Sequence, residues 1–171
     1  MSKIKVLHCL RHLGLGGTEK TCQLFFEHAN ANEFEVAVAY DANGSHPRKS
    51  EFEKACLMNG GMIHGITDSA SLQSLVDSFQ ADILHVYRSG FPEFPAPGLD
   101  VKVPHFIETN VFGYIEINSL IDRSLFMSEW LMLHAMRHSR IFRSPRFDFV
   151  NNPVESPCTE DVLPISRKWH E

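Results

Sequence analysis

The chain has 171 residues, the usual size of one folded domain, and 43% of them are hydrophobic, which is enough for a sizeable core. A formal net charge of −5, with acidic and basic residues interspersed, argues against a nucleic-acid partner, which would need clustered lysine and arginine. No secretory signal is visible, and no apolar stretch approaches the roughly 18 residues of a transmembrane segment, so a cytoplasmic location is expected.

The chain opens with an expected strand, a glycine-rich turn and an expected helix. Residues 4–10 form an apolar strand that ends before the glycines of residues 14–17. From Thr18, apolar residues recur at the i, i+3, i+4, i+7 spacing of a helix packed on one face. A second strand, rich in valine and alanine, is expected at residues 34–40.

Two more helices and two more strands are expected in the first half. Residues Ser50 to Glu53 have the pattern of a capping box, and the helix that it starts should stop at Asn59-Gly60. A short strand over residues 62–66 follows. Apolar residues between positions 72 and 79 mark a further helix, and residues 81–87 a fourth strand.

The second half is less regular. Three prolines within residues 91–98 prevent an ordinary helix, so this segment is predicted to be a loop. Three more strands are expected, at residues 103–107, 124–127 and 147–150. Ser128 is expected to cap a helix that runs to about His138.

Alternating strands and helices predict βαβ units with right-handed crossovers. The expected fold is therefore α/β: a Rossmann-like three-layer sandwich with a mainly parallel seven-strand sheet. Ligands of such sheets bind beyond the carboxyl ends of the strands, where polar residues stand in this sequence. Aromatic residues at helical spacings are expected in the core, namely Phe25, Phe26, Phe52, Phe79 and Trp130.

No cofactor and no metal site is expected. The cysteines lie far apart, without a Cys-x-x-Cys pair, and are interpreted as reduced, mostly buried thiols: Cys9, Cys22, Cys56 and Cys158. His134 and His138 could share a helix face, but Ala135 stands where a zinc-protease motif needs glutamate. Exposed histidines near a helix end are the simpler interpretation.

The glycine turn after the first strand is a candidate anion site. Gly14, Gly16 and Gly17 permit close approach to the backbone, and a helix N-terminus offers free N–H groups. The dinucleotide fingerprint and the P-loop pattern both fail, because each needs a small residue at position 19, where Glu19 stands. A tight turn without a ligand, with Glu19 complementing the helix dipole, remains the alternative.

Several segments, in this order, resemble the N-terminal half of family 4 retaining glycosyltransferases of GT-B fold. The first is the Gly-Gly-Thr-Glu sequence that opens the first helix. The others are residues 81–86, 107–113, 124–130 and 152–155. The resemblance covers residues 3 to about 155, and it rests on order and spacing rather than on one motif.

In that family, two Rossmann-like domains face each other across a cleft. The resemblance implies that residues 1–155 are the acceptor-side domain and that residues 156–171 are a linker or the start of a missing donor-binding domain. Gly16 and Gly17 would lie near the donor diphosphate. The residues implied on the acceptor side are Arg88, Glu108, Thr109 and Asn110. The histidine that many members carry after the fifth strand is not found in the Glu-Thr-Asn-Val sequence here, so no catalytic residue is assigned.

The implied reaction is transfer of a sugar from a nucleotide-sugar to a sugar or lipid-linked acceptor. Because the chain is too short for both domains, it is expected to be inactive alone and to need a donor-binding half, which a partner chain could carry. Two alternatives stay open. One is a non-catalytic binding or scaffold subunit, and the other is a small Rossmann-like nucleotide-binding protein.

Overall fold

The structure is a computed structural model that describes residues 2–14, 16–58, 60–88, 101–113, 120–138 and 146–150. The predicted loop at residues 91–98, the predicted domain boundary near residue 155 and Cys158 lie outside the described residues. The described part contains seven strands and four helices along the chain.

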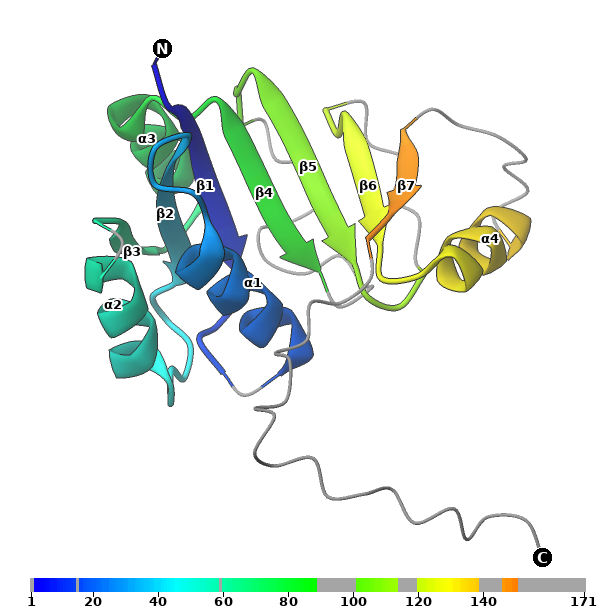
Figure 1. Ribbon diagram of the computed structural model, residues 1–171, viewed down its shortest axis with the longest axis horizontal. Coiled ribbons are helices and arrows are strands. Elements are labelled where there is room, and N and C mark those ends of the chain that lie inside the picture. The colour runs from blue at the N-terminus through cyan, green and yellow to red at the C-terminus, as the bar shows by residue number, and fades with distance from the viewer. Residues whose placement is uncertain are drawn as a thin grey trace, which may run out of the picture.

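All seven strands join one sheet in the order β3-β2-β1-β4-β5-β6-β7, and every neighbouring pair is parallel (Figure 1). The strands are β1 Ile4–Leu10, β2 Phe34–Asp41, β3 Met62–Ile66, β4 Ile83–Arg88, β5 His105–Asn110, β6 Arg123–Phe126 and β7 Phe147–Phe149. The helices are α1 Gly17–His28, α2 Lys49–Met58, α3 Ser69–Phe79 and α4 Glu129–His138. The predicted Rossmann-like fold is confirmed.

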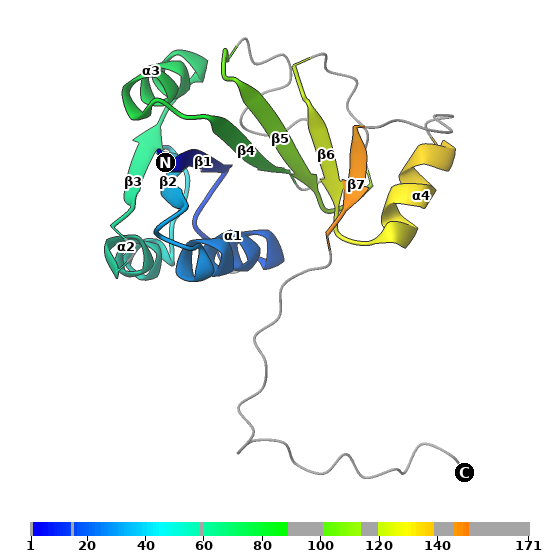
Figure 2. The ribbon, with the colours of Figure 1, turned by 45° about the horizontal axis from the view of Figure 1, so that its top comes forward.

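Helices lie on both faces of the sheet. Figure 2 shows α1 and α2 on one side of β1, β2 and β3, and α3 on the other side. Side chains alternate along β1 accordingly: Leu7 joins the core under α3, whereas Leu10 joins the core with Phe26 and Phe52 of α1 and α2. The helix α4 lies at the far end of the sheet, beside β7 (Figure 1).

Of the two helix caps predicted from the sequence, one is present in the structure and one is not. The expected cap of α4 is confirmed, because the Ser128 hydroxyl accepts a hydrogen bond from the Leu131 N–H at 3.2 Å. The capping box expected at Ser50 is wrong, because the Phe52 N–H already donates to the Arg48 carbonyl and α2 therefore begins before Ser50. A capping box does occur at α3, between Asp68 and Ser71.

Two of the five aromatic side chains predicted in the core are exposed. Phe26, Phe52 and Phe79 are buried as expected. Phe25 is 44% exposed, because successive residues of a helix point about 100° apart and Phe26 already faces the core. Trp130 is 69% exposed, because α4 at the sheet end buries only Ala135.

Candidate functional site

The sheet has one topological switch point, between β1 and β4. The chain moves outward from β1 through β2 to β3, then returns and moves the other way from β4 to β7. Beyond the carboxyl ends of the strands, such a point forms the crevice where ligands of open α/β sheets bind. The glycine turn follows β1, and Arg88 is the last residue of β4, so both predicted groups lie at this edge.

The glycine turn leaves the start of α1 open to approach. Gly17 is the first residue of α1, and a Cβ atom built on it would meet no heavy atom of the described residues within 4 Å. A Cβ atom on Gly16 would instead collide with an oxygen of the Glu19 carboxylate. Gly16 therefore makes room for Glu19, whereas no described residue fills the space beside Gly17.

Glu19 lies folded back over this turn. Its side chain is buried, and its Oε1 lies 3.0 Å from Nε2 of His12, just after β1. The carboxylate complements the positive end of the α1 dipole, as expected from its position in the first turn. It also places a negative charge beside the N–H groups that would hold a phosphate.

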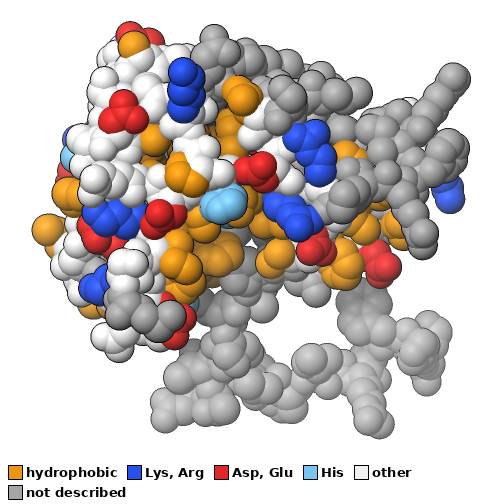
Figure 3. Space-filling model, turned by 90° about the horizontal axis from the view of Figure 1, so that it is seen from above, with side chains coloured by type: hydrophobic (Ala, Val, Ile, Leu, Met, Phe, Trp, Pro, Cys, Tyr) orange, Lys and Arg blue, Asp and Glu red, His pale blue; other side chains and the backbone are white. Residues whose placement is uncertain are grey.

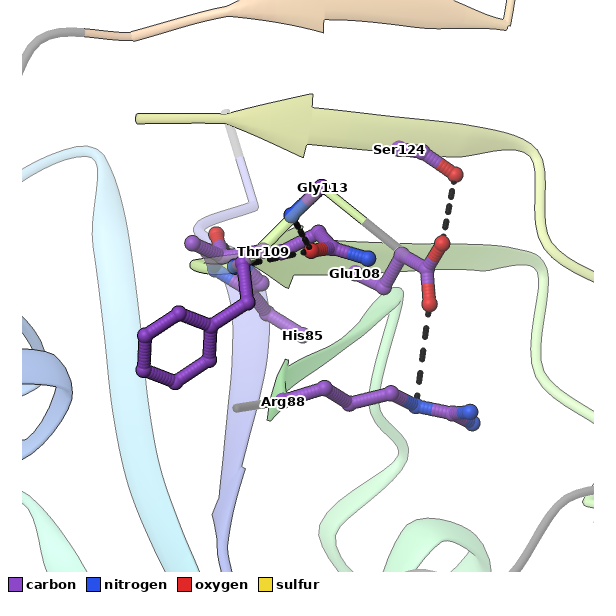
Figure 4. A network of polar contacts seen from close by, with 8 residues as sticks. His85, Arg88, Glu108, Thr109, Gly113 and Ser124 are labelled. Carbon is purple, nitrogen blue, oxygen red and sulfur yellow. Dashed lines mark hydrogen bonds and ion pairs between the residues drawn. The ribbon is translucent and has the colours of Figure 1, made fainter. Parts of the chain in front are cut away.

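Arg88, Glu108 and Ser124 form a buried network across β4, β5 and β6 (Figure 4). Glu108 Oε2 lies 3.6 Å from Arg88 Nε, and the Ser124 hydroxyl donates to Glu108 Oε1 at 2.6 Å. The Arg88 and Glu108 side chains are only 2% and 1% exposed. Burial raises the pKa of the Glu108 carboxyl, although the Ser124 hydrogen bond and the Arg88 charge oppose the rise.

Asn110 builds the turn after β5. Its Oδ1 accepts hydrogen bonds from the N–H groups of Phe112, at 3.2 Å, and Gly113, at 2.8 Å. Gly113 has a φ of +74°, a left-handed conformation that favours glycine. The side chain of Asn110 therefore supports the backbone of this turn at the carboxyl edge of the sheet.

Thr109 faces away from its neighbour Glu108. Successive strand residues point to opposite faces of a sheet, and the Thr109 hydroxyl contacts Nε2 of His85 at 2.7 Å on the α1 side. The four residues predicted on the acceptor side thus divide: Arg88 and Glu108 meet on one face, Thr109 points to the other, and Asn110 forms the turn. All four are buried.

A second buried polar cluster, not predicted from the sequence, lies under α1. The Tyr87 hydroxyl contacts Nδ1 of His8 at 3.2 Å, and the Tyr87 ring stacks on His85 at 4.4 Å. Burial lowers the pKa of His8 to about 4 and that of His85 well below its ordinary value, helped for His85 by the nearby His8. Both imidazoles are therefore neutral at pH 7. The two-residue spacing of His85 and Tyr87 on a strand was the available signal.

An apolar cavity of about 550 Å³ opens on the same face. It lies between α1 and the amino-terminal halves of the strands, with Val6, Ile83 and Ile107 in its wall and His8 and His85 beside them. Figure 3, seen from above, shows hydrophobic side chains gathered near the middle of the view. The cavity is at the opposite end of the strands from the glycine turn, and its neutral lining does not suit a diphosphate.

The described residues hold no group of three His, Cys, Asp or Glu side chains able to bind a metal ion. His134 and His138 are exposed on α4, with ring centroids 4.3 Å apart. Cys9, Cys22 and Cys56 are free, buried thiols, as expected. Within the part of the chain that is described, no helix combines the length and the hydropathy needed to cross a membrane.

The sequence matches no protein-family model and no curated protein. Solved structures share the fold, among them the following two. A glycosyltransferase from Rickettsia africae superposes with a TM-score of 0.61 and 10% identity, over 88% of this chain and 43% of that chain. A structure described as a UDP-N-acetylglucosamine 2-epimerase from Listeria monocytogenes gives 0.55 and 12%, over 86% of this chain and 45% of that chain. The chain thus spans less than half of either protein, and the likeness shows the fold alone.

Proposed function

We propose that this chain is the acceptor-side half of a glycosyltransferase that moves a sugar from a nucleotide-sugar to an acceptor. The observation that carries the proposal is the open backbone at Gly17, placed at the switch point between β1 and β4. The two fold neighbours, named for sugar transfer and for epimerisation of a UDP-sugar, support a nucleotide-sugar as the donor. The resemblance of the sequence to family 4 enzymes supports retention of configuration.

The glycine turn would act on the leaving diphosphate. N–H groups at the start of α1 are fixed donors, and fixed donors stabilise the charge that develops on a departing diphosphate. Donor binding also needs a second wall of the cleft, which we assign to a donor-binding domain or partner chain. A closed cleft excludes water and strengthens these electrostatic contacts.

Arg88, Glu108, Thr109 and Asn110 have a supporting role in this proposal. Their side chains are buried, so they shape the acceptor wall rather than reach the acceptor. Arg88 and Glu108 hold β4 and β5 together near the switch point, and Asn110 fixes the turn that follows β5. Residues that touch the acceptor are not assigned.

Substitution of Gly17 tests the proposal in the enzyme reconstituted with its donor-binding half. Gly17→Val should abolish sugar transfer and leave the fold intact, because the added side chain fills only the space that the diphosphate would use. Ser69→Val is the matched control, since Ser69 is the first residue of α3, away from the switch point. Unchanged turnover in Gly17→Val would favour a purely structural turn.

A further inference from the structure

The apolar cavity between α1 and the sheet is large enough to hold a small molecule. Its volume of about 550 Å³ lies within the range of known ligand sites, roughly 300 to 1,000 Å³. Apolar side chains form most of its wall, among them Leu24, Phe25, Val36, Ile107 and Leu125. Phe25 is 44% exposed, so a molecule bound here would cover apolar surface that the described residues leave open.

No fixed charge lines this cavity. None of its described lining residues is aspartate, glutamate, lysine or arginine. Burial lowers the pKa of His8 and that of His85, so both lining imidazoles are neutral at pH 7. The third lining histidine, His28, is exposed to solvent at the end of α1. A charged group would lose its hydration here without gaining a counter-charge, so the cavity suits an uncharged molecule.

Charged side chains line a neighbouring hollow instead. This hollow meets the cavity at Ile83 and Ile107, which line both. Its other lining residues are His105, Asp122, Arg123 and Arg146. An anionic head group would lie among these residues and away from His8, so experiment can distinguish an anionic ligand from an uncharged one.

Two imidazoles in the cavity wall each have one ring nitrogen held by the protein. The Tyr87 hydroxyl contacts Nδ1 of His8 at 3.2 Å, and the Thr109 hydroxyl contacts Nε2 of His85 at 2.7 Å. Among the described residues, the second nitrogen of each ring has no hydrogen-bond partner, and neither is fully enclosed. The ring centroids are 5.3 Å apart, so one polar group in the cavity can reach both rings.

The contact with Tyr87 decides which hydrogen-bonding group His8 offers. A phenol O–H is more acidic than a neutral imidazole N–H, and the other neighbour of this hydroxyl, the Cys22 thiol, is a weak acceptor. Tyr87 therefore donates to Nδ1, and Nε2 of His8 carries the proton. The Thr109 hydroxyl can donate or accept, so Nδ1 of His85 is a donor or an acceptor. A hydroxyl group, which accepts and donates, fits both cases.

We propose that this cavity binds a small, uncharged and mostly hydrocarbon molecule whose hydroxyl group hydrogen-bonds to His8 and His85. Apolar side chains of a second copy of the chain could cover the same wall. They would leave the second nitrogen of both imidazoles buried without a partner, which is unfavourable. The proposal stands independently of the sugar-transfer reaction, because the cavity and the glycine turn lie at opposite ends of the strands.

Calorimetric titration of the full chain with 1-octanol tests the proposal. 1-Octanol should bind at one site with a dissociation constant below about 1 mM. Octanoate, which has the same chain length and a charged head, should bind roughly tenfold more weakly. Ile107→Phe and Leu125→Phe should each lower the affinity for 1-octanol roughly tenfold, because the larger side chain fills part of the cavity. His8→Phe should lower it about fivefold, because a hydrogen bond is lost.

Leu57→Phe is the matched control. Leu57 lies on α2, is 77% exposed and does not line the cavity, so this variant should bind 1-octanol unchanged. Circular dichroism verifies that each variant is folded. The proposal would be overturned by absence of binding, by an equal loss in Leu57→Phe, or by unchanged affinity in both cavity-filling variants. Tighter binding of octanoate would assign an anionic ligand to the neighbouring hollow. A dimer that 1-octanol does not dissociate in analytical ultracentrifugation would assign the cavity to a second copy; either result would also overturn the proposal.

Discussion

The buried pair of Arg88 and Glu108 sets the strongest residue-scale constraint on the candidate site. Neither charge is solvated, so removing one partner leaves the other charge buried without this counter-charge. We expect Glu108→Gln to lower the free energy of unfolding by about 3 kcal/mol, and the double variant Arg88→Met/Glu108→Gln to recover much of the loss. Urea denaturation of the four proteins of this cycle measures the coupling, and additive losses would contradict it.

His8 makes stability depend on pH in the acid range. Its pKa is about 4 in the folded protein and 6.5 when unfolded, so the unfolded chain binds more protons between these values. Stability should therefore fall as the pH drops from 6.5 to 4, by about 3 kcal/mol from His8 alone, and His85 adds to the loss. Denaturation at several pH values measures this slope, which should flatten in His8→Phe.

The described thiols should resist alkylation in the native state. Burial raises the pKa of Cys9 and that of Cys56 to about 12, and raises that of Cys22 well above its ordinary value. The thiolate is the reactive form, so all three thiols should remain unlabelled by iodoacetamide at pH 8 and react once urea unfolds the chain. A Cys158→Ser background limits the assay to these thiols. Rapid native labelling would mean that α1 and α2 open locally.

At the scale of elements, the two glycines at the start of α1, Gly16 and Gly17, have different roles. Gly17→Ala should stabilise the chain by about 0.5 kcal/mol, because the site accepts a Cβ atom and alanine restricts the unfolded state. Gly16→Ala should destabilise it, because the new methyl group displaces Glu19 from His12. Thermal unfolding of both variants measures the contrast, and equal midpoints would contradict it.

Local sequence patterns predict the helices and strands of this fold well, but they predict less well which side chains are buried. The alternation of strand and helix signals was sufficient for a parallel sheet, because a right-handed crossover leaves few other arrangements. The burial of Phe25 and Trp130 could not be read from spacing, because a helical stripe shows which residues share a face and not what covers that face. The start of α2 could not be predicted from its local pattern either. Residues 50–53 have the pattern of a capping box, but α2 already begins at Lys49, so Ser50 lies inside the helix and does not cap it.

The candidate site was only partly predictable. The sequence places Arg88 and Glu108 near the carboxyl ends of neighbouring strands, and the two side chains do meet there. The opposite direction of Thr109 follows from strand alternation and was available from the sequence. The contact between Glu108 and Ser124 depends on the register of β5 against β6, which no short motif specifies.

At the scale of the whole molecule, the direction of the crossovers leaves part of one face without a helix in the described part of the chain. The connections through α1 and α2 lead from β1 toward β3, whereas the connection through α4 leads in the opposite direction along the sheet, from β6 to β7. Because the crossovers are right-handed, α1 and α2 lie on one face of the sheet and α4 on the other. Among the described residues no crossover helix therefore lies on the α1 face over β4, β5 and β6, and the apolar cavity opens there.

The last prediction concerns the 171-residue chain by itself. It should show no sugar transfer, because one wall of a cleft cannot exclude water from the reacting groups. Its affinity for nucleotide-sugars should be about millimolar or weaker, because the few N–H contacts at the α1 start scarcely offset the loss of ligand freedom, and Glu19 adds repulsion. Calorimetric titration with a panel of nucleotide-sugars, paired with a product assay, measures both. Micromolar binding would favour a self-sufficient nucleotide-binding protein, and sustained transfer would show that the chain needs no second domain.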